Sequence, residues 1–157
     1  MQRDRILKVL PVKVRRLIEE EQLQYDYLQE IRLRTGKPLL MIYRGDELIT
    51  GPGRGGPYIV TKEDIREMVG YISNYSLYAY EQEMKQGFIT IEGGHRVGMT
   101  GQAIIEDGKV KNIKYISSVN LRIAHEVLGC ADEIFPYVAL NRKLCHTLII
   151  SPPRCGK

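Results

Sequence analysis

The chain has 157 residues, of which 43% are hydrophobic, and its 23 Lys and Arg against 19 Asp and Glu leave a formal net charge of +4. This size and composition predict the core of one ordinary soluble domain together with a short remnant of another. No apolar run approaches the roughly 18 residues of a membrane span, and the N-terminus lacks an apolar signal core, so we expect a cytoplasmic protein. The small positive charge permits contact with nucleic acid or acidic lipid but does not demand it.

The cysteines exclude two common uses of this residue type. Cys130, Cys145 and Cys155 are odd in number and contain no C-x-x-C pair. The sequence therefore supports neither a disulfide framework nor a zinc knuckle, and we expect reduced thiols.

The first third of the chain changes from helical to strand periodicity. Pro11 suits the first position of a helix, and apolar residues recur at three- and four-residue spacing as far as Glu21. Three short strands are then predicted near residues 30–33, 39–43 and 48–50, separated by glycine turns. The stretch 51–57 is too rich in glycine and proline to be regular and is predicted to be a loop.

Two helices are predicted next. Thr61 and Asp64 have the spacing of a hydroxyl N-cap followed by an acid, and an apolar stripe at helical spacing lies behind them. A second helix is predicted from Ser76. The tyrosines around its start resemble a base-stacking platform, although their helical spacing favours packing; they are Tyr75, Tyr78 and Tyr80.

The following residues read as strands again. Segments 88–91, 95–105 and 110–117, with an Asp107-Gly108 hairpin turn, predict an antiparallel meander, and 119–123 predicts a further strand. The order of helix, strands, helices and strands indicates an α+β domain with helices on one face of an antiparallel sheet. Gly98 and Gly101, both inside one strand, indicate a bulge or the close approach of another backbone.

The end of the chain carries the most specific pattern. A helical connector over 130–141, with Pro136 in its first turn, leads to an apolar run over 144–150 that favours a strand. The next residues match most of the phosphate-binding loop G-x-x-x-x-G-K-[ST], with Ser in place of the first Gly and no final hydroxyl. The predicted nucleotide-binding residues are Ser151, Pro152, Pro153, Arg154, Cys155, Gly156 and Lys157. The alternative is a disordered Pro/Gly tail.

Several segments, in colinear order along nearly the whole chain, resemble the stage III sporulation protein AA family, whose members are relatives of the type II and type IV secretion ATPases. The segments are residues 30–38 (EIRLRTGKP), 73–76 (SNYS), 87–90 (GFIT), 93–98 (GGHRVG) and 149–153 (IISPP). The resemblance implies an N-terminal α/β domain over 1–128, like the PAS-like domain of secretion ATPases, a helical linker over 129–143, and the start of a RecA-like motor over 144–157. It also implies ATP and Mg²⁺ as cofactors of the full-length protein, a homo-oligomeric ring, and a membrane-associated sporulation secretion complex as partner.

The resemblance further places two arginines at an inter-subunit ATP site. Arg96 and Arg122 match strand arginines of secretion ATPases, and a guanidinium is suited to the role because it stays charged and presents a planar fork to phosphate oxygens. The alternative is that both pair with Glu92, Glu126 or another neighbour. His95 is either a catalytic base or metal ligand, or a satisfied sheet residue, and the lack of ligand partners favours the latter.

The 157 residues lack the loop's terminal hydroxyl, an acidic Mg²⁺ strand and most of a motor sheet, so we expect either an engineered fragment or a truncated gene product without ATPase activity of its own. Two other functions stay open. One is a nucleic-acid-binding module, favoured by basic residues near the N-terminus but opposed by Glu19, Glu20 and Glu21 and by the absence of a recognition motif. The other is a pure protein-interaction module.

Overall fold

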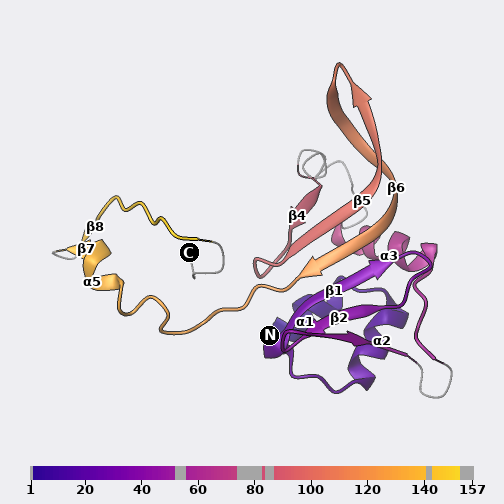
Figure 1. Cartoon of the computed structure of the whole chain (residues 1–157), viewed down its shortest axis with the longest axis horizontal. Helices are drawn as coiled ribbons and strands as arrows, with labels where there is room; N and C mark the ends of the chain where they lie inside the picture. Colours follow the sequence, from indigo (N-terminus) through magenta and orange to yellow (C-terminus); the bar gives the residue numbers. More distant parts are fainter. Residues whose placement is uncertain (1, 52–55, 74–82, 84–86, 141–142, 153–157) are drawn as a thin grey trace. The chain divides into compact units, whose positions relative to one another are not determined.

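The computed structural model describes residues 2–51, 56–73, 83, 87–140 and 143–152 (Figure 1). These residues form two compact units, Met1–Ala124 and His125–Lys157. Most of the predicted glycine loop and nearly all of the helix predicted from Ser76, with Tyr75, Tyr78 and Tyr80, lie outside the described residues.

The first unit begins with two short helices, α1 (Gln2–Lys8) and α2 (Val12–Glu20). The helix predicted at Pro11 is confirmed, with Pro11 as the residue just before its first turn. α1 was not predicted as a separate helix. The 3₁₀ turn Tyr25–Tyr27 then leads into the sheet.

A six-stranded antiparallel sheet follows, with the strand order β3-β2-β1-β6-β5-β4. Its strands are β1 (Leu28–Arg34), β2 (Leu40–Tyr43), β3 (Asp46–Ile49), β4 (Phe88–Thr90), β5 (Arg96–Glu106) and β6 (Lys109–Arg122). The predicted α+β class and antiparallel meander are confirmed.

The separate strand predicted at 119–123 is wrong, because β6 runs through this segment as one strand of 14 residues. The register changes between Thr100 and Gln102 of β5, where three residues of β6 bulge opposite Gly101. Tyr115, inside the bulge, has a φ of 49°, and a Cβ on Gly101 would lie 2.5 Å from the Lys114 carbonyl oxygen. The predicted close backbone approach is thus found at Gly101. The bulge interrupts the pattern that a continuous strand shows in sequence, which explains the wrong boundary.

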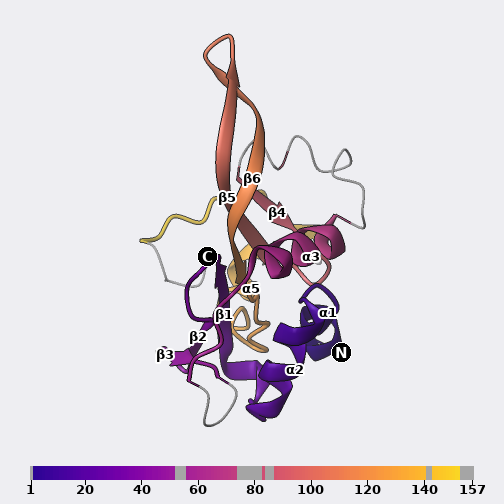
Figure 2. The same ribbon diagram turned by 90° about the vertical axis from the view of Figure 1, so that its right-hand side faces the viewer.

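Alternate residues of the sheet face the core. Ile31 and Leu33 of β1 and Val119 and Leu121 of β6 are fully buried, and they pair with one another across the two strands. The described helices of this unit, α1, α2 and α3 (Lys62–Ile72), lie together on this side of the sheet (Figure 2). Their buried residues include Ile6, Leu10, Val14, Ile18, Ile65 and Met68. None of these described helices lies on the opposite face of the sheet.

α3 begins at the predicted cap. The Thr61 hydroxyl accepts from the Asp64 N–H at 3.2 Å, and the Asp64 carboxylate accepts from the Thr61 N–H at 2.8 Å. The same carboxylate oxygen also accepts from the hydroxyls of Thr61 and Tyr58, at 2.7 and 2.8 Å. Asp64 is only 3% exposed, so these donors replace the water that burial removes.

The second unit contains a short helix, α5 (Phe135–Val138), and a two-residue hairpin of β7 (Ala139–Leu140) with β8 (Lys143–Leu144). Pro136 lies in the first turn of α5, as predicted. Residues 145–152 have no regular structure, which differs from the strand predicted over 144–150. A strand needs a hydrogen-bonded neighbour, and within the described residues only β7 offers one, as far as Leu144.

Replacement of Asp64 by alanine is expected to lower the free energy of unfolding by about 2 kcal/mol, because a helix cap is lost and buried donors lose their acceptor. The measurement is urea unfolding followed by circular dichroism. Glu63→Ala is the matched control, since Glu63 lies one residue earlier, is 69% exposed and pairs with Arg66, which is 77% exposed. If both variants lost the same free energy of unfolding, the loss in Asp64→Ala could not be attributed to the helix cap.

Candidate functional site

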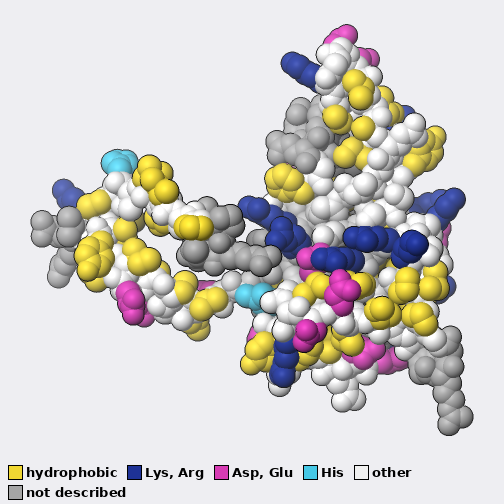
Figure 3. Space-filling model, in the orientation of Figure 1, with side chains coloured by type: hydrophobic (Ala, Val, Ile, Leu, Met, Phe, Trp, Pro, Cys, Tyr) yellow, Lys and Arg dark blue, Asp and Glu magenta, His cyan; other side chains and the backbone are white. Residues whose placement is uncertain are grey.

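The face of the sheet opposite the helices carries a row of charged side chains. Arg96 of β5 lies directly opposite Arg122 of β6, and Arg122 lies directly opposite Glu30 of β1. Because side chains alternate along a strand, the next residues on this face are Gly98, Asn120 and Arg32. Figure 3 presents this face and shows Lys and Arg side chains gathered in a band across it.

The two arginines predicted for the ATP site are brought together. Both are exposed, and they come from the two strands whose pairing is longest in this sheet. Among the described residues, no carboxylate lies within 4 Å of either guanidinium. The Arg96 guanidinium instead lies 5.9 Å from the centre of the Phe88 ring. Like charges directly opposite in an antiparallel pair are unfavourable, so this pair of residues does not serve the stability of the sheet.

Glu92, one of the acids considered as a partner, is occupied elsewhere. Its carboxylate lies 3.1 Å from Nε of Arg5. The interpretation that Arg96 is held by Glu92 is therefore not supported by the structure.

Glu30 is the anionic member of the row. It accepts a hydrogen bond from Nε of Arg32, whose other end lies 3.5 Å from the Glu47 carboxylate. Burial acts to raise the pKa of the Glu30 carboxyl, but hydrogen bonds from Arg32 and Asn120 and the nearby charges of Arg32 and Arg122 outweigh it. The pKa of Glu30 is consequently lowered, and the residue is ionised at neutral pH.

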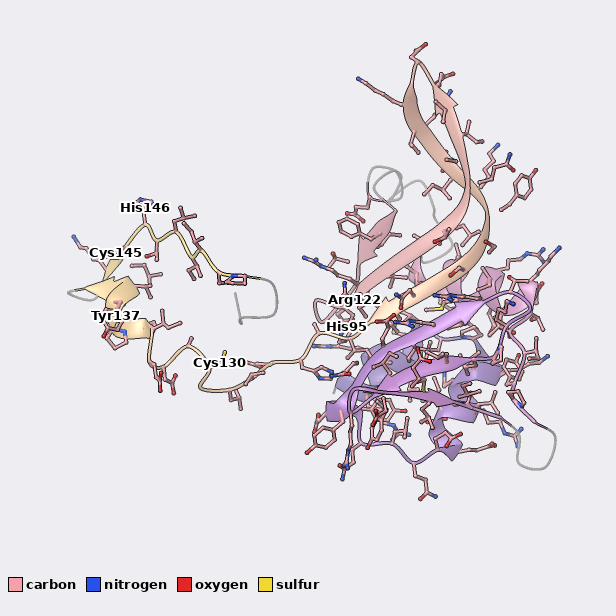
Figure 4. All side chains as sticks on the ribbon, in the orientation of Figure 1. His95, Arg122, Cys130, Tyr137, Cys145 and His146 are labelled. Carbon is pink, nitrogen blue, oxygen red and sulfur yellow. The ribbon has the colours of Figure 1, made fainter. Side chains whose placement is uncertain are left out.

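His95 directly precedes β5. It is 1% exposed, and its Nδ1 accepts a hydrogen bond from the backbone N–H of Ala124 at 3.0 Å. Figure 4 shows it beside Arg122, at the end of β6. The bond ties the end of β6 to the start of β5. In the part of the chain that the structure describes, no group of three or more His, Cys, Asp or Glu is arranged to hold a metal ion.

The predicted phosphate loop belongs to the second unit. Ser151 is half-buried and Pro152 is exposed, whereas Pro153, Arg154, Cys155, Gly156 and Lys157 lie outside the described residues. Cys130 and Cys145 are exposed free thiols. Of the described helices, none combines the length and the apolar character that crossing a bilayer requires.

Sequence reasoning missed Glu30 and Phe88 as neighbours of the two arginines. The alternation in Glu30-Ile31-Arg32-Leu33-Arg34 is the signal that places three charged residues on one face of a strand. The neighbours of that strand follow only from its register, which the sequence does not reveal.

The family model of sporulation stage III protein AA matches residues 1–157. This chain belongs to the stage III sporulation protein AA family. It is 40% identical over 153 residues to the stage III sporulation protein AA of Bacillus subtilis strain 168, which covers 97% of this chain and 48% of the relative. The chain thus spans about half the length of that family member.

Among solved structures, the chain is similar to the X-ray structure of the Legionella pneumophila ATPase DotB. The match has a TM-score of 0.41 and 18% sequence identity, and it covers 73% of this chain and 29% of that ATPase.

The lowered pKa of Glu30 predicts a pH-dependent contribution to stability. A carboxyl whose pKa is lower in the folded than in the unfolded state stabilises the fold above its unfolded value, near 4.5, and this contribution is lost as the pH falls. Glu30→Gln is therefore expected to lower the free energy of unfolding at pH 7 by about 1–2 kcal/mol, with the difference from the parent shrinking below pH 4.5.

Urea unfolding across this pH range measures the effect. Glu47→Gln is the control, because Glu47 contacts the same arginine but is 63% exposed, and its removal is expected to change little at any pH. A Glu30→Gln loss of stability that is the same at all pH values would contradict the electrostatic explanation.

Proposed function

We propose that this chain is the N-terminal part of a secretion-type ATPase and that Arg96 and Arg122 contact the phosphates of an ATP molecule bound by another copy of the protein. The observation that carries the proposal is the direct opposition of these two exposed arginines on the sheet face opposite the described helices. Two guanidiniums held side by side repel each other. A multiply charged anion bound between them attracts both, and this attraction outweighs their mutual repulsion.

Triphosphate is the anion that best fits family membership and the partial phosphate loop. Secretion-type motors place the nucleotide between the motor of one subunit and the N-terminal domain of a subunit, and the resemblance extends this arrangement to the present family. Residues 151–157 then belong to the loop that cradles the phosphates, and Mg²⁺ is held by the motor domain. The assembly is a ring of identical copies, and its place is the cytoplasmic face of a membrane-associated sporulation complex.

The proposal predicts the effect of shortening either arginine in the full-length protein. Arg96→Ala or Arg122→Ala is expected to lower ATP turnover by roughly 10³-fold, with a much smaller change in nucleotide affinity, because the charge on the transferring phosphoryl group grows in the transition state. Arg→Lys is expected to restore little activity, since lysine keeps the charge but loses the bidentate fork. Steady-state phosphate release and nucleotide titration measure the two quantities.

Arg34→Ala provides a matched control, because Arg34 is exposed on the same face of β1 but lies opposite Ser118 rather than in the row. Lys157→Ala provides the opposite control, a variant expected to lose nucleotide binding itself. Full turnover in both Arg96→Ala and Arg122→Ala would remove these residues from the site.

A nucleic-acid partner is the second candidate, and one observation favours it: beyond the row, Arg34 adds a further exposed positive charge on the same face of β1, which a single triphosphate does not require. Affinity for a nucleic acid falls steeply with salt, roughly as the number of phosphates contacted. Fluorescence anisotropy with a labelled single strand and a labelled duplex, from about 50 to 200 mM salt, separates the candidates. Absence of binding at the lowest salt argues against the nucleic-acid function.

A further inference from the structure

Gly98 is the third residue of β5, on the sheet face opposite the described helices, and it is paired with Phe88 of β4 on one side and Asn120 of β6 on the other. Glycine is disfavoured in such a position, because it loses more backbone freedom on folding than other residues and offers no side chain to pack. A glycine inside a paired strand therefore indicates a structural or functional requirement for glycine at that position.

The described residues provide no structural reason for it. The φ of Gly98 is not in the left-handed region, so the backbone does not demand glycine. The ladder is regular from Arg96 to Thr100, so no bulge is present at this point. A Cβ on Gly98 would have its nearest described neighbours at 3.9 Å, the carbonyl oxygens of Asn120 and Gly87, which is ordinary contact.

The aromatic ring of Phe88, the residue opposite Gly98 on β4, does not fill the space next to Gly98. Aromatic side chains opposite a strand glycine often pack over it. Here the Phe88 ring lies toward the Arg96 guanidinium, and no atom of it comes within 4 Å of the Cβ position of Gly98. Phe88 itself is 39% exposed.

Gly101, three residues further along the same strand, shows the contrast. Its Cβ would lie 2.5 Å from the Lys114 carbonyl oxygen and 3.1 Å from Cα of Ile116, both of them backbone atoms. The bulge of β6 thus requires glycine at 101, and no described residue makes a comparable demand at 98.

We propose that Gly98 is a glycine because the phosphate group bound by Arg96 and Arg122 comes into contact with the β5 backbone at this point. The inference rests on the proposed function and adds a residue to its site. Arg96 precedes Gly98 by two residues on the same face, and Arg122 is its diagonal neighbour on β6. A side chain at 98 would occupy space on the face that carries both arginines, and would hold the anion away from the β5 backbone.

The first test concerns stability, measured as the thermal midpoint of the 157-residue chain. Gly98→Ala and Gly98→Val are expected to leave the midpoint unchanged or raise it by about 2 °C, because alanine and valine suit a strand better than glycine. Gly101→Ala is expected to lower it by several degrees. A loss at Gly98 as large as that at Gly101 would show a structural role for Gly98 and overturn the inference.

The second test concerns ATP turnover in the full-length protein. Turnover is expected to fall roughly 10-fold in Gly98→Ala and 10²-fold in Gly98→Val, since a displacement of about 1 Å at a reacting group has effects of this size. Thr100→Val, at the next position on the same face, is the control and is expected to stay within about twofold of the parent.

Combination with the arginine variants separates this inference from the proposed function. Gly98→Val introduced into Arg96→Ala should change turnover by less than about threefold, because the contact that it blocks is already weakened. If the arginine variants lose turnover while Gly98→Val keeps it, the proposed function stands and the inference about Gly98 is wrong. If Gly98→Val loses turnover while both arginine variants keep it, the group that approaches Gly98 is not the phosphate, and the inference is again overturned.

Discussion

The pairing of β6 with β1 is the constraint on which the first unit depends. Strands β1, β2 and β3 come early in the chain and β4 and β5 come late, and among the described strands only β6 is hydrogen-bonded to both sets. The pairing of residues 118–122 with residues 30–34 closes a loop of chain that contains most residues of the unit. Such long-range pairing is formed at a high cost in chain entropy, and the core that it assembles has to offset this cost.

The register of this pairing is set by the core and determines the outer face. Ile31 opposite Leu121 and Leu33 opposite Val119 are buried pairs, and they alternate with Glu30 opposite Arg122 and Arg32 opposite Asn120. A shift by one residue would turn the arginines into the core and the apolar residues into water. The charges of the candidate site are therefore aligned by buried apolar residues on the opposite face of the same strands.

This dependence explains what the sequence could and could not predict. The cap at Thr61 and Asp64 is a local pattern with a local cause, and it was predicted with its partners. The strands and the α+β class follow from alternation, which is also local. The continuity of β6 was missed because its bulge, residues 115–117, shifts the alternation of side chains just before the predicted boundary at 118. The neighbourhood of Glu30 and Arg122 was missed because it joins residues far apart in the chain, and only the folded register brings them together.

The two arginines of the site differ in how far their charge is already balanced. Arg122 has a carboxylate, that of Glu30, on the residue directly opposite it, and the charge of Arg122 adds to the effects of Arg32 and Asn120 that lower the pKa of this acid. Arg96 has Arg122 on one side and Thr90 on the other, with the Phe88 ring as its closest described aromatic contact. A ring attracts a cation but does not neutralise it. Among the described residues, the positive charge of the row is therefore least balanced at its Arg96 end, and the anion that we propose would gain most there.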